Sequence, residues 1–178
     1  MSIIDKALAA ITPPESDHKR AEATAKARSA AETGDWLSLA LDHHHQIRSA
    51  FTEALAATDA SSRLTAMRRL ALVLNGHALA EEIVLYPALA KAGEKTHASV
   101  AYGEQTTTKL QMAELERIDP GSEAWRDKLE HIEGAVLHHM FEEEGAWFLE
   151  LKEKCADQDR LTVRFKEEFD RYAGAAPP

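Results

Sequence analysis

One pattern of polar and apolar residues occurs twice in the chain, 62 positions apart. His77 and Glu81 in the first copy correspond to His139 and Glu143 in the second. The aromatic and leucine residues that follow keep the same offset: Tyr86 and Leu89 against Phe148 and Leu151. Residues four positions apart share one face of an α-helix. The repeat therefore predicts two helices, related by an approximate two-fold axis, that each present an imidazole beside a carboxylate.

The rest of the chain favours helix as well. It has 178 residues with only 8 Gly and 6 Pro, 44% hydrophobic and 29% charged residues, which suits one globular helical domain. Helical periodicity and turn signals predict long helices over residues 36–57, 63–85, 95–117 and 122–154. Short connections between long helices favour an antiparallel up-down-up-down four-helix bundle. The expected fold class is therefore all-α, with additional short N- and C-terminal helices.

Three segments are expected along the chain. Residues 1–34 form an N-terminal helical extension, in which Pro13 and Pro14 separate residues 1–11 from a surface or capping helix over 16–32. Residues 35–155 form the bundle, with Asp35 as the N-cap of its first helix. Residues 156–178 form a C-terminal helix, ending near Tyr172, and a tail. Tyr86-Pro87 is expected to bend or end the second long helix.

Charge and cysteine content exclude several classes of function. The formal net charge of −9 argues against nucleic acid or an anionic membrane as the main partner. A single cysteine, Cys155, excludes an internal disulfide and a thiolate-rich metal site. The first thirty residues contain no apolar run long enough for a signal peptide or a membrane span, so we expect a cytoplasmic protein.

The duplicated pair indicates a metal site. A lone His-x3-Glu pair is usually a surface hydrogen bond, and a run of Glu is usually solvated. Here apolar side chains such as Leu79, Ile83 and Trp147 accompany the pairs, and a buried His-Glu pair without a metal is costly unless fully hydrogen-bonded. Three adjacent histidines at 43–45 add a third cluster. A mixed imidazole and carboxylate set suits iron or manganese better than zinc.

Three segments carry a family resemblance. They read Asp-His-His-His-x-Ile-x3-Phe from residue 42, His-x3-Glu-Glu-x3-Tyr-Pro from residue 77, and His-x3-Glu-Glu-x3-Phe from residue 139. In this order, over residues 36–151, the sequence resembles the hemerythrin and HHE cation-binding family. The resemblance implies a non-haem di-iron centre with oxo and carboxylate bridges and an open position for a small ligand. The expected metal ligands are His44, His77, Glu81, Glu104, His139 and Glu143.

Two of these ligands are chosen among neighbours. In relatives, the first-helix ligand stands three residues before an aliphatic residue and seven before Phe or Leu, which favours His44. His43 is the alternative if the helix is rotated, since one residue turns a side chain by about 100°. The family's third-helix histidine is absent, because its usual position falls on Gln105. Glu104 is the anionic substitute, and His97 lies two turns away. A carboxylate there should favour the ferric state and peroxide turnover over reversible oxygen carriage.

The expected function follows from this centre. The chain should hold two iron ions, with manganese as a possible replacement, and bind or sense dioxygen, peroxide, nitric oxide or iron itself. The alternative is a di-iron enzyme that decomposes peroxide or reduces nitric oxide. A metal-free helical protein acting through partners is disfavoured by the repeat.

Overall fold

The structure is a computed structural model, and it describes residues 15–174. This range is built of helices, with no strand in it, so the prediction of an all-helical fold is confirmed. None of the helices in residues 15–174 is both long and apolar enough to cross a membrane. The first part of the expected N-terminal extension, residues 1–14, lies outside the described residues.

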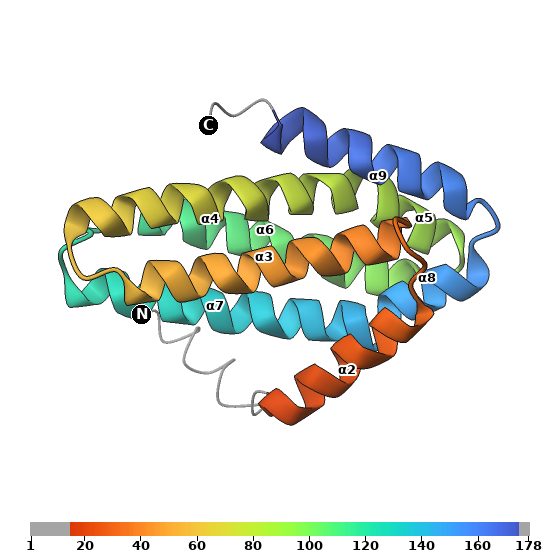
Figure 1. Ribbon diagram of the computed structural model, residues 1–178, viewed down its shortest axis with the longest axis horizontal. Helices are drawn as coiled ribbons and strands as arrows, with labels where there is room; N and C mark the ends of the chain where they lie inside the picture. Colours follow the sequence, from red (N-terminus) through yellow and green to blue (C-terminus); the bar gives the residue numbers. More distant parts are fainter. Residues whose placement is uncertain (1–14, 175–178) are drawn as a thin grey trace.

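Four long helices make up most of the molecule: α3 (Trp36–Ala56), α4 (Ala60–Ala80), α6 (Lys95–Leu115) and α7 (Glu123–Glu142). Figure 1 shows them side by side along the longest axis of the molecule. Side chains at three N-caps accept backbone N–H groups and fix where these helices begin: Asp35 from Ser38 (2.7 Å), Asp59 from Ser62 (2.9 Å) and Ser122 from Trp125 (3.2 Å).

The duplicated sequence pattern has a duplicated backbone feature. α4 runs without a break through a π-helical segment, η1 (Glu81–Leu85), into α5 (Tyr86–Lys91). α7 runs in the same way through η2 (Glu143–Trp147) into α8 (Phe148–Lys154). Each π segment begins at the glutamate of a His-x3-Glu pair. Short π segments inside α-helices occur frequently at functional sites, so the backbone marks the same two places as the sequence.

The sequence predicted that Tyr86-Pro87 would bend or end this helix, and Pro87 does not end it. In η1 the bonding pattern reaches back five residues, from the N–H of Tyr86 to the carbonyl of Glu81. Pro87 has no N–H, so the next carbonyl, that of Glu82, would lack a donor. The hydroxyl of Tyr102 donates to it instead, at 2.6 Å. The second copy has Leu149 at this position, so the π segment does not require proline.

Two further helices pack onto the long ones. α2 (Asp17–Ala30) lies against η2, α3 and α8, with Ala23 and Ala27 buried. α9 (Gln158–Ala173) lies against α4 and α3, with Leu161 and Phe165 buried (Figure 1). Both helices therefore contribute to the packing around the long helices.

A polar layer divides the hydrophobic core. On α3, Leu37 and Leu41 belong to one buried apolar cluster and Ile47 and Phe51 to another, with His44 between them. α4 and α6 cross the boundary between the two clusters in the same way, at His77 and Gln105, and α7 reaches it where it continues into η2, at Glu143. Buried polar groups need partners, so this layer is where a ligand or a hydrogen-bond network must lie.

The Tyr102 hydroxyl gives the first prediction. Tyr102→Phe should lower the free energy of unfolding by about 1 kcal/mol, because the Glu82 carbonyl loses its donor. In a Pro87→Ala background the cost of Tyr102→Phe should fall towards zero, since the new N–H at position 87 can donate to that carbonyl. Urea unfolding of the four proteins in this cycle measures both costs. Equal costs in the two backgrounds would contradict this account of Pro87.

Candidate metal centre

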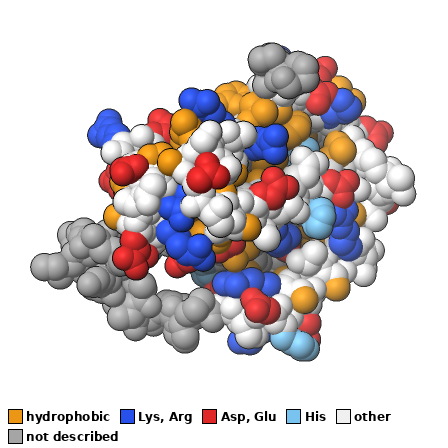
Figure 2. Space-filling model, turned by 60° about the vertical axis from the view of Figure 1, so that its left-hand side comes forward, with side chains coloured by type: hydrophobic (Ala, Val, Ile, Leu, Met, Phe, Trp, Pro, Cys, Tyr) orange, Lys and Arg blue, Asp and Glu red, His pale blue; other side chains and the backbone are white. Residues whose placement is uncertain are grey.

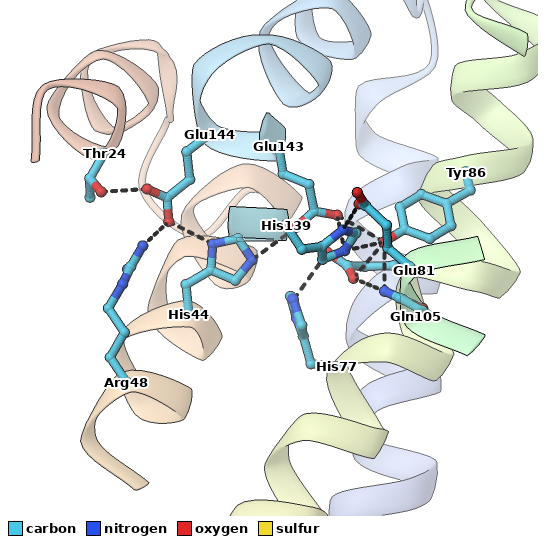
Figure 3. Close-up of polar contacts among 11 residues, drawn as sticks. Thr24, His44, Arg48, His77, Glu81, Tyr86, Gln105, His139, Glu143 and Glu144 are labelled. Atoms are coloured by element: carbon cyan, nitrogen blue, oxygen red, sulfur yellow. Dashed lines mark hydrogen bonds and ion pairs between the residues drawn. The ribbon is translucent and has the colours of Figure 1, made fainter. Parts of the chain in front are cut away.

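Four buried side chains converge in the polar layer. His44, His77, Glu81 and Glu143 each offer one ligand atom, and these atoms all lie within 4.8 Å of one another. His44 lies on α3, His77 and Glu81 belong to the first copy of the repeat on α4 and η1, and Glu143 belongs to the second copy on η2 (Figure 3). Both copies of the repeat and the first long helix therefore meet here. Bonds from nitrogen or carboxylate oxygen to a metal are roughly 2.0–2.2 Å long. Small side-chain adjustments would let all four atoms share one ion.

The donor atoms facing this point have no hydrogen-bond partner. The His44 Nε2 atom lies 3.3 Å from Oε2 of Glu143, and His77 Nε2 lies 3.1 Å from Oε1 of Glu81. All four atoms are buried without a hydrogen bond. A buried polar group left unpaired costs about 1–3 kcal/mol. A cation bound between them would satisfy every one, so the residues fit a metal ion.

The second oxygen of each glutamate points to another group. Oε1 of Glu143 lies 3.3 Å from Nε2 of His139 and accepts a hydrogen bond from the hydroxyl of Tyr86 at 2.8 Å. The same hydroxyl lies 3.1 Å from Oε2 of Glu81 and 3.0 Å from His139 Nε2. The amide nitrogen of Gln105 donates to Glu81 Oε2 at 2.6 Å. Each carboxylate thus has one oxygen on each side, which is the arrangement of a bridging ligand.

The two glutamates have opposite pKa shifts. Burial by itself would raise the pKa of Glu143, but the charges of the nearby His139 and His44 rings outweigh it and hold this pKa well below its ordinary value. Burial and the negative charge of Glu143 raise the pKa of Glu81 well above its ordinary value. Two buried carboxylates this close repel each other, and a bound cation would relieve the repulsion.

His44 is the histidine of the triplet that joins this group. Burial would lower its pKa, but contacts with the carboxylates of Glu143 and Glu144 raise it to about 9. His43 turns towards α9, where its ring stacks on Phe169 with centroids 3.7 Å apart, and burial lowers the pKa of His43 to about 3. His45 is exposed.

The predicted residues of α6 lie in different places. Glu104 is half-buried and accepts a hydrogen bond from Nδ1 of His139 at 2.8 Å, on the opposite side of the ring from the four-residue group. Its role as a direct ligand stays a prediction. Gln105 is buried and reaches Glu81 and the hydroxyl of Tyr86. His97 lies with Glu150, at 2.9 Å, in a separate and more exposed cluster.

Sequence reasoning overlooked three residues around His44. Glu144 is fully buried and accepts a hydrogen bond from Nδ1 of His44 at 2.7 Å. It also accepts from Arg48, at 2.8 Å, and from the hydroxyl of Thr24 on α2 (Figure 3). Arg48 stands four residues after His44, a spacing that could have placed it beside that histidine. Nothing in the sequence links Thr24 to the site.

A small, mainly apolar cavity adjoins the polar layer. Its volume is about 20 Å³. A cavity needs roughly 10–15 Å³ by this measure to hold a water molecule, so it can accept one molecule of about that size. The lining includes His77, Gln105 and His139 together with Ile47, Leu74, Ala78, Val136 and Met140.

Comparison with known proteins agrees with this geometry. The family model for the hemerythrin HHE cation binding domain matches residues 15–151. The chain belongs to this family. It is also similar to a protein named DNA nickase from Nostoc sp. (strain PCC 7120 / SAG 25.82 / UTEX 2576), with 24% identity over 126 residues. The match covers 71% of this chain but 35% of that relative, so the hemerythrin-like chain spans about a third of it. No solved structure gives a significant match.

The triplet of histidines provides a direct test of the hemerythrin-like centre. His44→Ala should reduce iron bound per chain far more than His43→Ala or His45→Ala, because only His44 contributes to the four-residue group. Elemental analysis of the three proteins after loading with ferrous iron measures this. His45→Ala serves as the matched control, since its side chain is exposed. A larger loss in His43→Ala than in His44→Ala would contradict the assignment.

Proposed function

We propose that this chain is a hemerythrin-like protein that holds a pair of non-haem iron ions, or a mixed iron and manganese pair, and binds or senses a small molecule there. The observation that carries the proposal is the convergence of four buried donor atoms that lack any other partner. The proposed centre lies within an antiparallel four-helix bundle formed by α3, α4, α6 and α7.

The donors divide between two ions. His44 and His77 would hold the first ion, with one oxygen each from Glu81 and Glu143. The remaining oxygens of the two glutamates and Nε2 of His139 would hold the second. The hydroxyl oxygen of Tyr86 contacts all three of these atoms. We therefore propose that the Tyr86 hydroxyl lies beside the second ion as a hydrogen-bond donor.

Glu104 has a supporting role in this assignment. Metal-bound histidines usually donate their other ring N–H to a carboxylate, which fixes the tautomer and raises the basicity of the coordinating nitrogen. The contact of Glu104 with Nδ1 of His139 is of this kind. The charge of Glu104 therefore still favours the ferric state of the second ion, but it acts through the ring of His139.

The surrounding residues suit a small ligand. A bound iron pair supplies redox chemistry and an open coordination position. Burial and the charges of Glu143 and Glu81 raise the pKa of Tyr86 well above its ordinary value, so its hydroxyl keeps a proton in the metal-free protein. The adjoining cavity accepts a molecule of about the size of water. These features favour dioxygen, peroxide or nitric oxide over larger molecules.

Peroxide decomposition is the second candidate function. The specific observation in its favour is a pair of hydrogen-bond donors beside the proposed bridging carboxylates. The amide nitrogen of Gln105 lies 2.5 Å from the hydroxyl oxygen of Tyr86. A protonated hydroxyl at this place can deliver a proton to a departing oxygen atom. Reversible binding needs no such donor of protons, so turnover under peroxide separates the two functions.

Nucleic acid is a poor candidate for the ligand. The relative named DNA nickase corresponds to this chain over only 35% of its own length. This chain has a net charge of −9, and duplex DNA binding depends on neutralising phosphates with Lys and Arg. On the face in Figure 2, positive and negative side chains are interspersed. We therefore propose a small ligand at the metal centre and no cleavage of DNA.

Loading with ferrous iron under anaerobic conditions tests the proposed function. The expected result is up to two ions per chain by elemental analysis, followed by a new visible absorption band when oxygen or peroxide is added. A band that reverses when the gas is removed indicates carriage, and continued peroxide consumption indicates an enzyme. Protein that takes up no iron or manganese would refute the proposal.

Chelation provides an independent measurement. A ligand that binds only the folded state stabilises it by about 2.7 kcal/mol at a hundredfold excess over its dissociation constant. Removing the metal should therefore lower Tm in the native protein. His77→Ala and Glu143→Ala should have a lower Tm than the metal-loaded native protein and show no further shift with chelator. A full chelator shift in both variants would place the metal elsewhere in the chain.

A further inference from the structure

Glu144 is a carboxylate that the proposed metal centre does not use as a ligand. It follows Glu143 directly, is fully buried, and has three hydrogen-bond donors around it: His44, Arg48 and Thr24. Arg48 can only donate, and it shares Oε1 of Glu144 with His44, while the hydroxyl of Thr24 donates to Oε2. Glu144 is therefore the acceptor in all three contacts, and Nδ1 of His44 carries the proton between them.

This contact determines which nitrogen of His44 faces the metal centre. With Nδ1 held by Glu144, Nε2 is the nitrogen that faces the point where Glu81, Glu143 and His77 converge, and it is the nitrogen that a metal ion would bind. The Nε2 atom is buried and has no hydrogen bond of its own. His77, by contrast, has no partner at Nδ1. Among the ligands of the first ion, only His44 has its ring held by a buried acid.

The first copy of the repeat provides an internal comparison. Glu82 occupies the position that corresponds to Glu144, 62 residues earlier, and likewise stands second in a π segment. Its carboxylate is only partly buried and accepts both its hydrogen bonds from Lys109, at 2.6 Å each. Glu82 contacts none of the histidines. The two copies therefore share the motif but differ in whether the second glutamate reaches a metal-binding ring.

The third donor to Glu144 comes from a different part of the chain. Thr24 lies on α2, 120 residues away in sequence, and its hydroxyl contacts Oε2 of Glu144, while His44 and Arg48 share Oε1 (Figure 3). α2 packs closely on η2 here, since a Cβ at Gly145 would lie 3.8 Å from that of Ala23. One side of the acid thus faces the metal ligand, and the other faces the N-terminal helix.

We propose that Glu144 is a positioning residue for the metal ligand His44 and that, through Thr24, it couples metal binding to the docking of α2. This inference rests on the proposed function, because it takes His44 as a ligand. A metal on Nε2 makes the Nδ1–H group a stronger donor to Glu144, and the carboxylate is best held when Thr24 also donates to it. Coupling between two binding events is reciprocal, so metal binding should stabilise docked α2 as much as docking favours metal binding.

The experiment compares four variants of the full chain with the native protein. Glu144→Gln keeps the shape of the side chain and removes its charge, and Thr24→Val removes the hydroxyl. Glu82→Gln is the matched control for the first, at the equivalent repeat position. Ser29→Ala is the control for the second, because Ser29 is an exposed residue of α2 whose hydroxyl bonds only within that helix. Circular dichroism and Tm establish that each variant is folded.

Metal affinity and spectra test the positioning role. Affinity is measured with Fe²⁺ under anaerobic conditions against a competing chelator, and Co²⁺ provides a visible spectrum that reports the ligand geometry. Glu144→Gln should weaken the first ion by about 10- to 100-fold, the usual cost of losing an acid that orients a metal-bound histidine, and should shift the Co²⁺ spectrum. Thr24→Val should weaken it by about 5-fold, at the lower end of coupling between sites. The two controls should match the native protein in both measurements.

Hydrogen exchange of residues 17–30 tests the coupling. In the native protein, Fe²⁺ should slow exchange in α2, and this protection should disappear in Glu144→Gln and Thr24→Val but persist in the controls. Exchange in α2 that does not respond to metal in the native protein would overturn the coupling. Equal affinity and spectra in Glu144→Gln and the native protein would overturn the positioning role alone. A native protein that binds no metal would overturn the proposed function and this inference together. If Glu144→Gln fails to fold, Thr24→Val decides, since its change lies outside the ligand set.

Discussion

The burial of two carboxylates in the middle of the core is the constraint on which the rest of the structure depends. Glu81 and Glu143 are both fully buried, and their mutual repulsion is opposed by the imidazoles of His44 on α3 and His139 on α7. Unpaired buried charges cost far more than a single hydrophobic contact returns. The apolar residues therefore separate into two clusters, and each long helix contributes a polar residue at the level between them. The same layer presents the buried donor atoms that a cation would need.

The π segments show how the backbone adapts to that layer. Each begins at a buried glutamate and is followed by an aromatic residue that faces the centre, Tyr86 after η1 and Phe148 after η2. Phe148 stacks on the ring of His44 with centroids 5.7 Å apart, whereas Tyr86 directs its hydroxyl to both glutamates and His139. The aromatic residues of the two copies thus differ in function. The one next to His44 is apolar, and the one next to His139 has a hydroxyl that can donate a hydrogen bond.

The same repeat diverges in its second glutamate. Glu82 pairs with a lysine near the surface, while Glu144 lies buried between His44 and the N-terminal helix. Repetition builds a site with approximate two-fold symmetry, and contacts outside the repeat then make its halves unequal. α9 has a comparable effect on the triplet of histidines, because Phe165 and Phe169 stack on His43 and leave its neighbour His44 for the centre.

The sequence by itself determined the helices, their approximate limits and the two His-x3-Glu pairs, because helical periodicity, caps and i,i+4 spacing are local properties of one segment. The tertiary structure alone decided how these pairs are completed. It placed His44 in the group, turned Glu104 towards the far nitrogen of His139, and brought Thr24 to Glu144. Such contacts depend on how each helix is rotated and how deeply its neighbours pack. A rotation of one residue, about 100°, exchanges a ligand for a core or surface side chain, and packing between distant segments sets that rotation.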